Sequence, residues 1–117
     1  MVSSIGNSIS AINAFTKKMD VTANNIANVA TNDFKKSKAD IIAGSDDGVR
    51  VDITQVNTPG HSITENQEGQ ERVVESSNVD LTEELTEIIP IQIGYQANLK
   101  SVMAQDKMLG NLFDITA

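Results

Sequence analysis

The sequence predicts an α+β fold, with a long helix near each end and a small β insertion between them. Apolar residues recur every seven positions in both terminal segments, whereas the middle segment alternates apolar and polar residues. The 117 residues include three Phe, one Tyr and no Trp, which favours narrow seams between helices over a broad aromatic core. The length fits one domain, with helical segments at 1–34 and 78–117 around an insertion at 35–77.

The first segment has the seam pattern of a helix that packs on another helix. The residues spaced seven apart are Ile5, Ile12, Met19 and Ile26. The pattern ends after Ala30, where "TND" supplies turn-forming residues. Asn32 or Asp33 is expected to adopt the left-handed conformation that closes the helix.

The last segment repeats this pattern over a longer span. Leu81, Ile88, Tyr95, Val102 and Leu109 lie seven apart, and Leu85 and Leu99 lie four residues after Leu81 and Tyr95. Asp80 is the expected N-cap, with Glu83 in the capping-box position.

Pro90 interrupts this helical pattern, because proline removes one backbone hydrogen bond and clashes with the preceding turn. Either the helix kinks at Pro90 or it breaks near Ile89. The sevenfold repeat continues through the proline in register, so we expect a kinked but continuous helix.

The middle segment predicts short strands. "GVRVDITQV" alternates apolar and polar residues, "SDDG" before it is a turn, and "ADIIAG" is the expected partner strand. "NTPGHSITENQEGQE" is expected to be a mobile loop because it is rich in polar and turn-forming residues, and "ERVVES" is a candidate third strand.

Composition excludes several classes of function. Residues 40–87 carry twelve Asp and Glu against two Arg, which argues against nucleic-acid binding. This acidic block is either a solvated surface or a surface that steers a basic partner. The chain has no cysteine, no segment that resembles a cleaved signal peptide, and no apolar run near the roughly 20 residues that span a bilayer.

Catalytic groups are sparse. His61 is the single histidine and lies in a polar segment, where a histidine is usually solvated. Adjacent carboxylates such as Asp46 and Asp47 are typical of solvent-facing positions, and "DDGVRVD" lacks the ligand spacing of a calcium loop. We therefore expect no enzymatic activity, no cofactor and no metal site.

Two stretches resemble the signatures of the flagellar axial family, which comprises rod, hook and hook-junction proteins. "MDVTANNIANVATNDFKKS" is similar to the motif that closes the first helix in that family. The C-terminal run from "SNVDLTEELTE" through "YQAN" to "NLFDI" is similar to the second motif. The positions that match are Asn24, Asn25, Ala27, Asn28, Thr31 and Phe34 in the first motif and Tyr95, Gln96, Ala97 and Asn98 in the second.

The resemblance implies an architecture and a cellular role. In this family the terminal helices pair as an antiparallel coiled coil, and many copies pack helically into a tube. The implied role is a structural subunit of the basal-body rod, a periplasmic homo-oligomer in contact with other axial proteins. Such subunits pass through the flagellar type III export apparatus without a cleaved signal and without inserting directly into the membrane.

Some features depart from the family pattern. Asp33 occupies the position of a usual glycine, and Pro90 falls where helix formers are usual. The short middle is closest to proximal-rod members. Two alternatives remain open: an accessory axial protein that never enters the rod, and a helical hairpin that binds partners outside flagella.

The assembly surface is expected to combine the seam residues with the motif residues. A single hairpin seam cannot bury every face of both helices, so surplus apolar residues, including Ile93, Met103 and Met108, would face neighbouring subunits. Three asparagines within the first helix, Asn24, Asn25 and Asn28, would either fix packing by hydrogen bonding to neighbours or simply face water.

Overall fold

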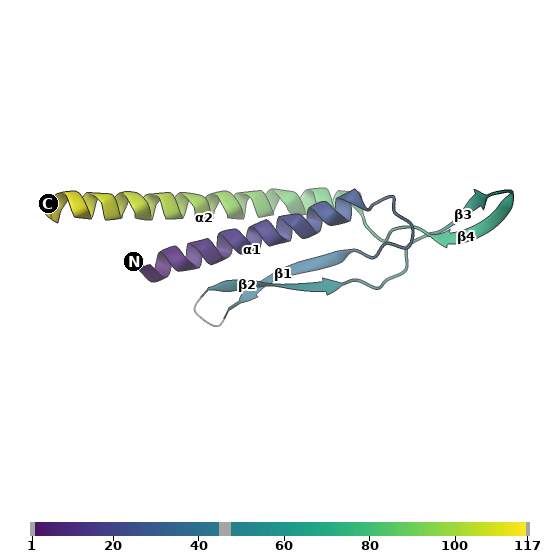
Figure 1. Ribbon diagram of the computed structural model, residues 1–117, viewed down its shortest axis with the longest axis horizontal. Coiled ribbons are helices and arrows are strands. Elements are labelled where there is room, and N and C mark those ends of the chain that lie inside the picture. Colours follow the sequence, from purple (N-terminus) through teal and green to yellow (C-terminus); the bar gives the residue numbers. More distant parts are fainter. Residues whose placement is uncertain (1, 45–47, 117) are drawn as a thin grey trace.

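The protein is an elongated molecule of 80 × 23 × 21 Å. The computed structural model describes residues 2–44 and 48–116. Two long helices lie side by side along the molecule, and two separate β-hairpins connect them in the chain (Figure 1). The predicted α+β fold with a small β insertion is confirmed.

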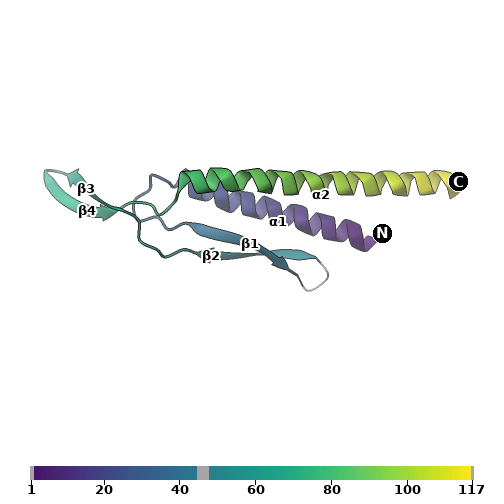
Figure 2. The same cartoon turned by 180° about the vertical axis from the view of Figure 1, so that it is seen from behind.

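Helices α1 (Val2–Ala27) and α2 (Leu81–Thr116) pair in opposite directions. Ser4 near the start of α1 donates to Oε1 of Gln105 near the end of α2, at 2.9 Å. At the other end of the pair, Asn25 of α1 donates to Glu84 of α2. Figures 1 and 2 show that the C-terminal end of α2 extends beyond the N-terminus of α1.

Helix α1 ends at Ala27, three residues earlier than the sequence pattern predicts. Asn28 therefore lies in the closing turn and not within the helix, and its side-chain amide donates to the carbonyl of Asn24 at 2.9 Å. Asp33 has a φ of 59°, which confirms the predicted left-handed conformation, but it lies beyond the turn that follows Ala27 and does not cap α1 as expected. Its amide donates to the carbonyl of Glu75 at 2.8 Å, so the turn is tied to the end of a distant strand.

Helix α2 begins with the predicted N-cap. Oδ1 of Asp80 accepts hydrogen bonds from the amides of Thr82 and Glu83 at 2.8 and 3.3 Å. The helix continues through Pro90, which confirms the predicted continuity. The ribbon of α2 shows no sharp bend along its length, so the predicted kink is wrong (Figure 1). Pro90 is exposed, so the carbonyl that loses its helical partner lies near solvent.

Strands β1 (Ser37–Ala43) and β2 (Val49–Gln55) form the predicted hairpin, with Ala39 opposite Ile53. Both strands contact α1. Ala39 is 4% exposed, which makes this hairpin part of the small core. The predicted turn at 45–48 lies mostly outside the described residues.

Strands β3 (Ser62–Gln67) and β4 (Gln70–Glu75) form a second hairpin that projects away from the helix pair (Figures 1 and 2). The predicted third strand is confirmed as β4, but the prediction of a mobile loop is wrong at residues 62–67. Glu68 and Gly69 have φ values of 55° and 83°, as the tight turns of two-residue hairpins require. This turn pairs two strands whose side chains lie almost entirely in solvent.

The core is small and partly polar. Its buried apolar side chains are Ala14, Ala39 and Ile91, and its buried polar side chains are Ser8, Thr22, Asn25, Ser77 and Glu84. Phe15 lies against Gly94, where a Cβ atom would overlap its ring. Small side chains thus bring α1 and α2 close together.

Candidate assembly surface

Asn25 joins α1, β1 and α2 at the end of the helix pair where α1 ends and α2 begins. This side chain is 2% exposed and pairs with both backbone groups of Ser37 in β1. Its Nδ2 donates to the Ser37 carbonyl at 2.7 Å, and its Oδ1 accepts from the Ser37 amide at 3.0 Å. A further bond from Nδ2 reaches Oε2 of Glu84 at 3.1 Å. The amide of Asn25 therefore occupies the place that a neighbouring strand would take beside β1.

Asn78 holds the segments that lead into the hairpins. Its Nδ2 donates to the carbonyls of Val56 and Thr58 at 2.7 and 2.9 Å. Its Oδ1 accepts from the amide of Lys36 at 2.7 Å. Asn25 and Asn78 together fix where the insertion leaves and rejoins the helices.

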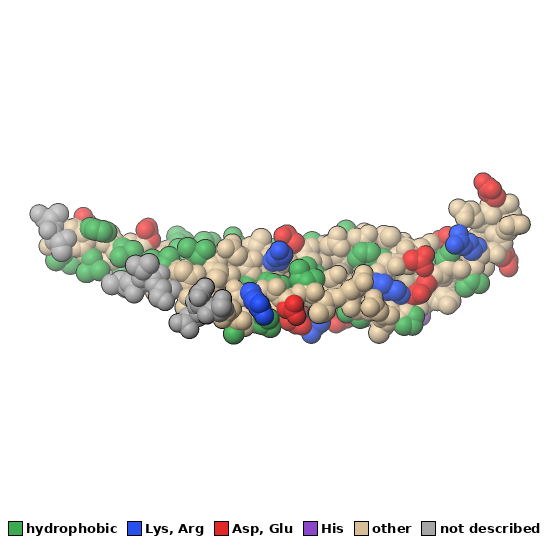
Figure 3. Space-filling model, turned by 60° about the horizontal axis from the view of Figure 1, so that its bottom comes forward, with side chains coloured by type: hydrophobic (Ala, Val, Ile, Leu, Met, Phe, Trp, Pro, Cys, Tyr) green, Lys and Arg blue, Asp and Glu red, His purple; other side chains and the backbone are tan. Residues whose placement is uncertain are grey.

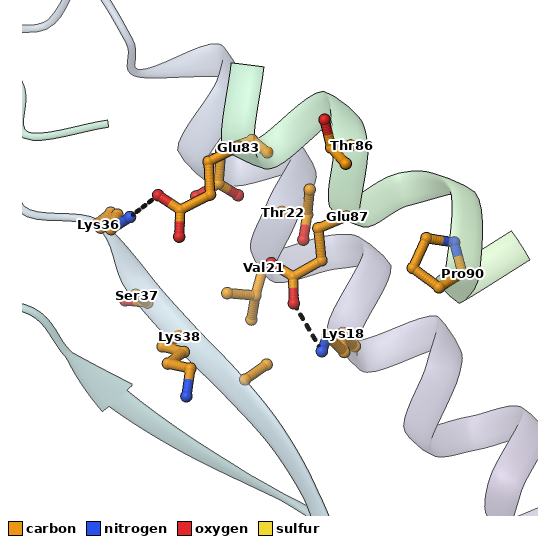
Figure 4. A pocket seen from close by; sticks show the side chains of 12 residues that line it. Lys18, Val21, Thr22, Lys36, Ser37, Lys38, Glu83, Thr86, Glu87 and Pro90 are labelled. Carbon is orange, nitrogen blue, oxygen red and sulfur yellow. Dashed lines mark hydrogen bonds and ion pairs between the residues drawn. The ribbon is translucent and has the colours of Figure 1, made fainter. Parts of the chain in front are cut away.

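A groove of about 330 Å³ lies beside this junction, between β1, α1 and the first turns of α2 (Figure 4). Two ion pairs line it: Lys18 to Glu87 and Lys36 to Glu83, each at 2.7 Å. The hydrogen bond to Glu83 raises the pKa of Lys36. The three lysines that line this groove, Lys18, Lys36 and Lys38, are therefore already paired with carboxylates within the chain.

Two carboxyl groups near the junction have opposite pKa shifts. Glu84 is 3% exposed, and its burial raises its pKa even though Asn25 donates to it. Hydrogen bonds from Lys35 and from the amide of Gly60 lower the pKa of Glu75. Burial dominates at Glu84, whereas hydrogen bonding dominates at Glu75.

The residues predicted for helix pairing occupy two environments. Those that are half-buried are Ile5, Ile12, Met19, Ile26, Ile88, Tyr95, Asn98, Val102 and Leu109. Those that are exposed are Leu81, Leu85, Gln96 and Leu99. The structure thus places the first set along the margins of the α1–α2 contact and the second set on the outside of α2.

The motif residues near the end of α1 are also divided. Asn25 is buried, Asn28 and Phe34 are half-buried, and Asn24 and Thr31 are exposed. The hydroxyl of Thr31 donates to Oδ1 of Asn28 at 3.1 Å. Asn24, Asn28 and Thr31 therefore close the end of α1, whereas Asn25 fastens the helix to β1.

The outer face of α2 presents large apolar side chains to solvent. Leu85, Ile89 and Ile93, four residues apart, are 50%, 59% and 63% exposed. Met103 and Met108 further along the helix are also more than half exposed, which confirms the exposure predicted for Ile93 and both methionines. Figure 3 shows hydrophobic side chains, with a few acidic ones among them, over the C-terminal part of α2, and most of the charged side chains over the middle of the molecule and toward the hairpins. We call the exposed residues Leu85, Ile89, Ile93, Met103 and Met108 the apolar face of α2.

Sequence reasoning missed the residues at the centre of the α1–α2 contact. In α2 these include Glu84 and Ile91, seven residues apart, and Ile91 is 1% exposed. In α1 they include Ser8 and Thr22, which lie seven residues before and after Phe15, a residue that the apolar pattern did place in the seam. Most of these side chains are polar or small, so hydrophobic periodicity identified the margins of the seam instead. Glycine at 94, one turn from Ile91, was the available signal for close helix contact.

The described parts of the chain contain no cluster of three His, Cys, Asp or Glu residues suited to a metal ion. Neither helix, over its described residues, is long and apolar enough to cross a membrane.

Comparisons with known proteins relate both ends of the chain to flagellar proteins. The family model "Flagella basal body rod protein" matches residues 5–35, and the model "Flagellar basal body rod FlgEFG protein C-terminal" matches residues 70–115. Two proteins named "Flagellar hook protein FlgE", from two strains of Helicobacter pylori, are each 48% identical to this chain over 42 residues. That alignment covers 36% of this chain and 6% of each hook protein.

The matched segments coincide with the paired helices and the junction between them. The first contains most of α1 and its closing turn, and the second runs from the start of β4 nearly to the end of α2. The two family models therefore match in the expected order, and each contains one helix of the antiparallel pair. The chain belongs to the flagellar rod and hook family of axial structural proteins.

Proposed function

We propose that this chain is a structural subunit of the flagellar basal-body rod and that it assembles helically through its paired terminal helices. The observation that carries the proposal is the apolar face of α2. A single copy leaves Ile89 and Ile93 more than half exposed on a helix whose opposite side is already covered by α1. Contact with a neighbouring copy would remove this surface from water, and a contact that does not close into a ring would propagate as a filament.

The short insertion favours a position in the proximal rod over one in the hook. Between the two matched segments lie residues 36–69, and the described part of this range, 36–44 and 48–69, contains β1, β2 and β3 but no further folded unit. On this proposal the subunit acts in the periplasm without catalysing a reaction. It reaches that location through the flagellar type III export apparatus, without a cleaved signal, and contacts other axial proteins.

Deletion of the gene followed by electron tomography of basal bodies tests the proposal. Complementation with the wild-type chain should restore rods and motility, whereas Ile93→Glu should not, because it places a charge on the apolar face of α2. Gln92→Glu is the matched control, since Gln92 is an exposed neighbour on the same helix. Intact rods and normal motility in the deletion strain would contradict the building-block role and leave an accessory role.

A further inference from the structure

We propose that the edge of β4 in one copy pairs with the open edge of β2 in a second copy, so that the β1–β2 sheet gains a strand from its neighbour. This inference rests on the proposed self-assembly and names a second contact for it, distinct from the apolar face of α2. It follows from the hydrogen-bond directions of the two hairpins, from a groove beside β2 and from the charges on both sides.

The open edge of β2 has unused backbone groups. The amide of Gly44 donates to the carbonyl of Gly48, and the amide of Val56 donates to the carbonyl of Lys36. These two bonds show which residues of the β1–β2 ladder point their backbone groups toward the partner strand. Residues that alternate with these pairs point their N–H and C=O groups away from the partner strand. In β2 the outward residues are Val49, Val51, Ile53 and Gln55.

One end of this edge is already occupied, and the rest is available. The amide of Val49 donates to Oγ of Ser10 in α1, at 3.2 Å. The outward amides of Val51 and Ile53 have no hydrogen-bond acceptor among the described residues. The side chain of Ile53 is 43% exposed. The equivalent edge of β1 is different, because Asn25 occupies both backbone groups of Ser37.

A groove of about 280 Å³ runs between β2 and α1 on this side of the sheet. Its lining includes Lys17 and Arg50 and no carboxylate. Neither cation forms an ion pair with any described residue, in contrast to Lys18 and Lys36 in the groove beside β1. An acidic extended segment is therefore the occupant that this groove favours.

Strand β4 provides such a segment. Ser76 donates to the carbonyl of His61, which makes Glu71, Val73 and Glu75 the outward residues of β4. The carbonyl of Glu75 accepts from Asp33, whereas the edge from Glu71 to Val73 has no such partner among the described residues. Val73 is 70% exposed, and Glu71 lies on the same face of β4 and forms no ion pair with any described residue, whereas the carboxylate of Glu75 is already paired with Lys35. Arg72 between them lies on the opposite face of the strand.

The pairing must join two copies. Within one chain β2 and β4 belong to separate two-stranded sheets that do not contact each other. The β3–β4 hairpin projects beyond the helix pair, while the β1–β2 hairpin lies alongside α1 (Figure 1). A projecting strand at one end and an open edge further along the molecule give a head-to-tail contact, which extends and does not close. Pairing would also cover two strand edges that are otherwise exposed.

Cysteine scanning tests this contact directly, because the chain has no cysteine of its own. Full-length Ile53→Cys would be mixed with single-cysteine variants at every position of β3 and β4, and mixed disulfides would be identified by mass after mild oxidation. Strand pairing predicts crosslinks at alternate positions of β4, because only side chains on the same face of a sheet come close enough. Uniformly low yields, or equal yields at consecutive positions, would overturn the inference.

Charge reversal provides a second measurement. Lys17→Glu in the Ile53→Cys copy, or Glu71→Lys in the β4 copy, should each lower the crosslink yield by about two- to fivefold, and combining them should restore it. The matched control is Lys107→Glu, which makes the same charge change at an exposed position of α2 that does not line this groove. No effect of Lys17→Glu, or an equal effect of Lys107→Glu, would count against the proposed pairing.

Light scattering on the same samples separates the two proposals. Assembly without the alternating crosslinks would overturn the strand pairing and leave assembly through α2 standing. If the crosslinks persist and Ile93→Glu still builds normal rods, the role of the apolar face of α2 is contradicted and the strand pairing stands. Failure of both assembly and crosslinking would overturn both.

Discussion

Asn25 shows how a residue that disfavours helices can stabilise a helical protein. Asparagine costs about half a kcal/mol or slightly more relative to alanine in a helix interior. Here the cost is offset, because one buried amide satisfies both backbone groups of Ser37 and also donates to Glu84. Backbone groups at a buried strand edge would otherwise be left without partners. The side chain thus sets the position of β1 against α1.

Replacing Asn25 by alanine should destabilise the protein by about 2 to 4 kcal/mol, because it leaves buried polar groups of β1 without partners. Urea unfolding followed by circular dichroism measures this change. Asn24→Ala is the control: Asn24 is exposed on the same helix turn, and its loss should stabilise the protein by about 0.5 kcal/mol. Similar stabilities for the two variants would show that the bonds to Ser37 contribute little.

Glu84 makes the stability of the junction depend on pH. Burial raises its pKa in the folded chain above the ordinary value of 4.5, so the folded state binds this proton more tightly than the unfolded state. The contribution of Glu84 to the free energy of unfolding therefore falls as pH rises from about 4.5 through its folded pKa. Glu84→Gln removes this charge and keeps an oxygen that can accept from Asn25.

The difference in unfolding free energy between Glu84→Gln and the wild type should grow in favour of the variant from about pH 4 to about pH 7. Taking the difference removes the contributions of other groups, including Glu75, whose lowered pKa gives the opposite slope. Urea titrations at several pH values provide the measurement. A difference that stays constant, or that favours the wild type increasingly as pH rises, would contradict the assigned burial effect.

At the scale of elements, α1 and α2 approach closely because Gly94 leaves room for the ring of Phe15. Gly94→Ala should destabilise the protein by about 1 to 3 kcal/mol, since the added methyl group overlaps that ring and outweighs a helix-propensity gain of about 1 kcal/mol. Gly110→Ala should instead stabilise the protein, because nothing lies within 4 Å of the position that the added Cβ atom would take. Thermal unfolding of both variants checks this prediction, and a stabilised Gly94→Ala would contradict the close packing.

The helices could be predicted from sequence because their apolar repeats survive at the margins of the contact. The repeat also passed through Pro90 in register, and α2 is continuous there. The centre of the contact could not be predicted in the same way. It is formed by residues such as Ser8, Thr22 and Glu84, whose burial depends on hydrogen bonds and on close backbone approach.

The two hairpins were predictable to different degrees, because only the one that packs on α1 has an alternating pattern of buried and exposed residues. Strand β2 rests on α1, and its half-buried residues Val49 and Val51 alternate with exposed ones. Strand β3 has no buried face, so its sequence "SITENQ" carries no alternation, and only its hydrogen bonds with β4 define it. The hydrogen bonds from Asn25 to the backbone of Ser37 also leave no periodic pattern in the sequence. The asparagine-rich motif predicted polar contacts, but Asn25 makes them within the chain.

At the scale of the whole molecule, stabilising contacts are concentrated at one end. The ion pairs, Asn25, Asn78 and both hairpin connections lie near the start of α2, whereas the last turns of α2 extend beyond α1 (Figures 1 and 2). Few buried contacts imply a low free energy of local opening. A single copy is therefore expected to be least stable at the end that carries Met108.

Hydrogen exchange on the monomer should show this gradient. Backbone amides around Asn25 and Ile91 should be protected most strongly, while those before Ser8 in α1 and after Met108 in α2 should exchange fastest. Assembly should then slow exchange along the open end. Uniform strong protection of residues 2–30 in the monomer would contradict an end that becomes ordered on assembly.

The central claim is that the chain is built into the rod through the apolar face of α2. Mass-spectrometric quantification of the chain in purified basal bodies tests it most directly, with the wild type, Gln92→Glu and Ile93→Glu expressed at equal levels. We expect the wild type and Gln92→Glu to be present in a fixed ratio to other rod components and Ile93→Glu to be lost. Basal bodies with complete rods that lack the wild-type chain, or that retain Ile93→Glu in full, would contradict the claim.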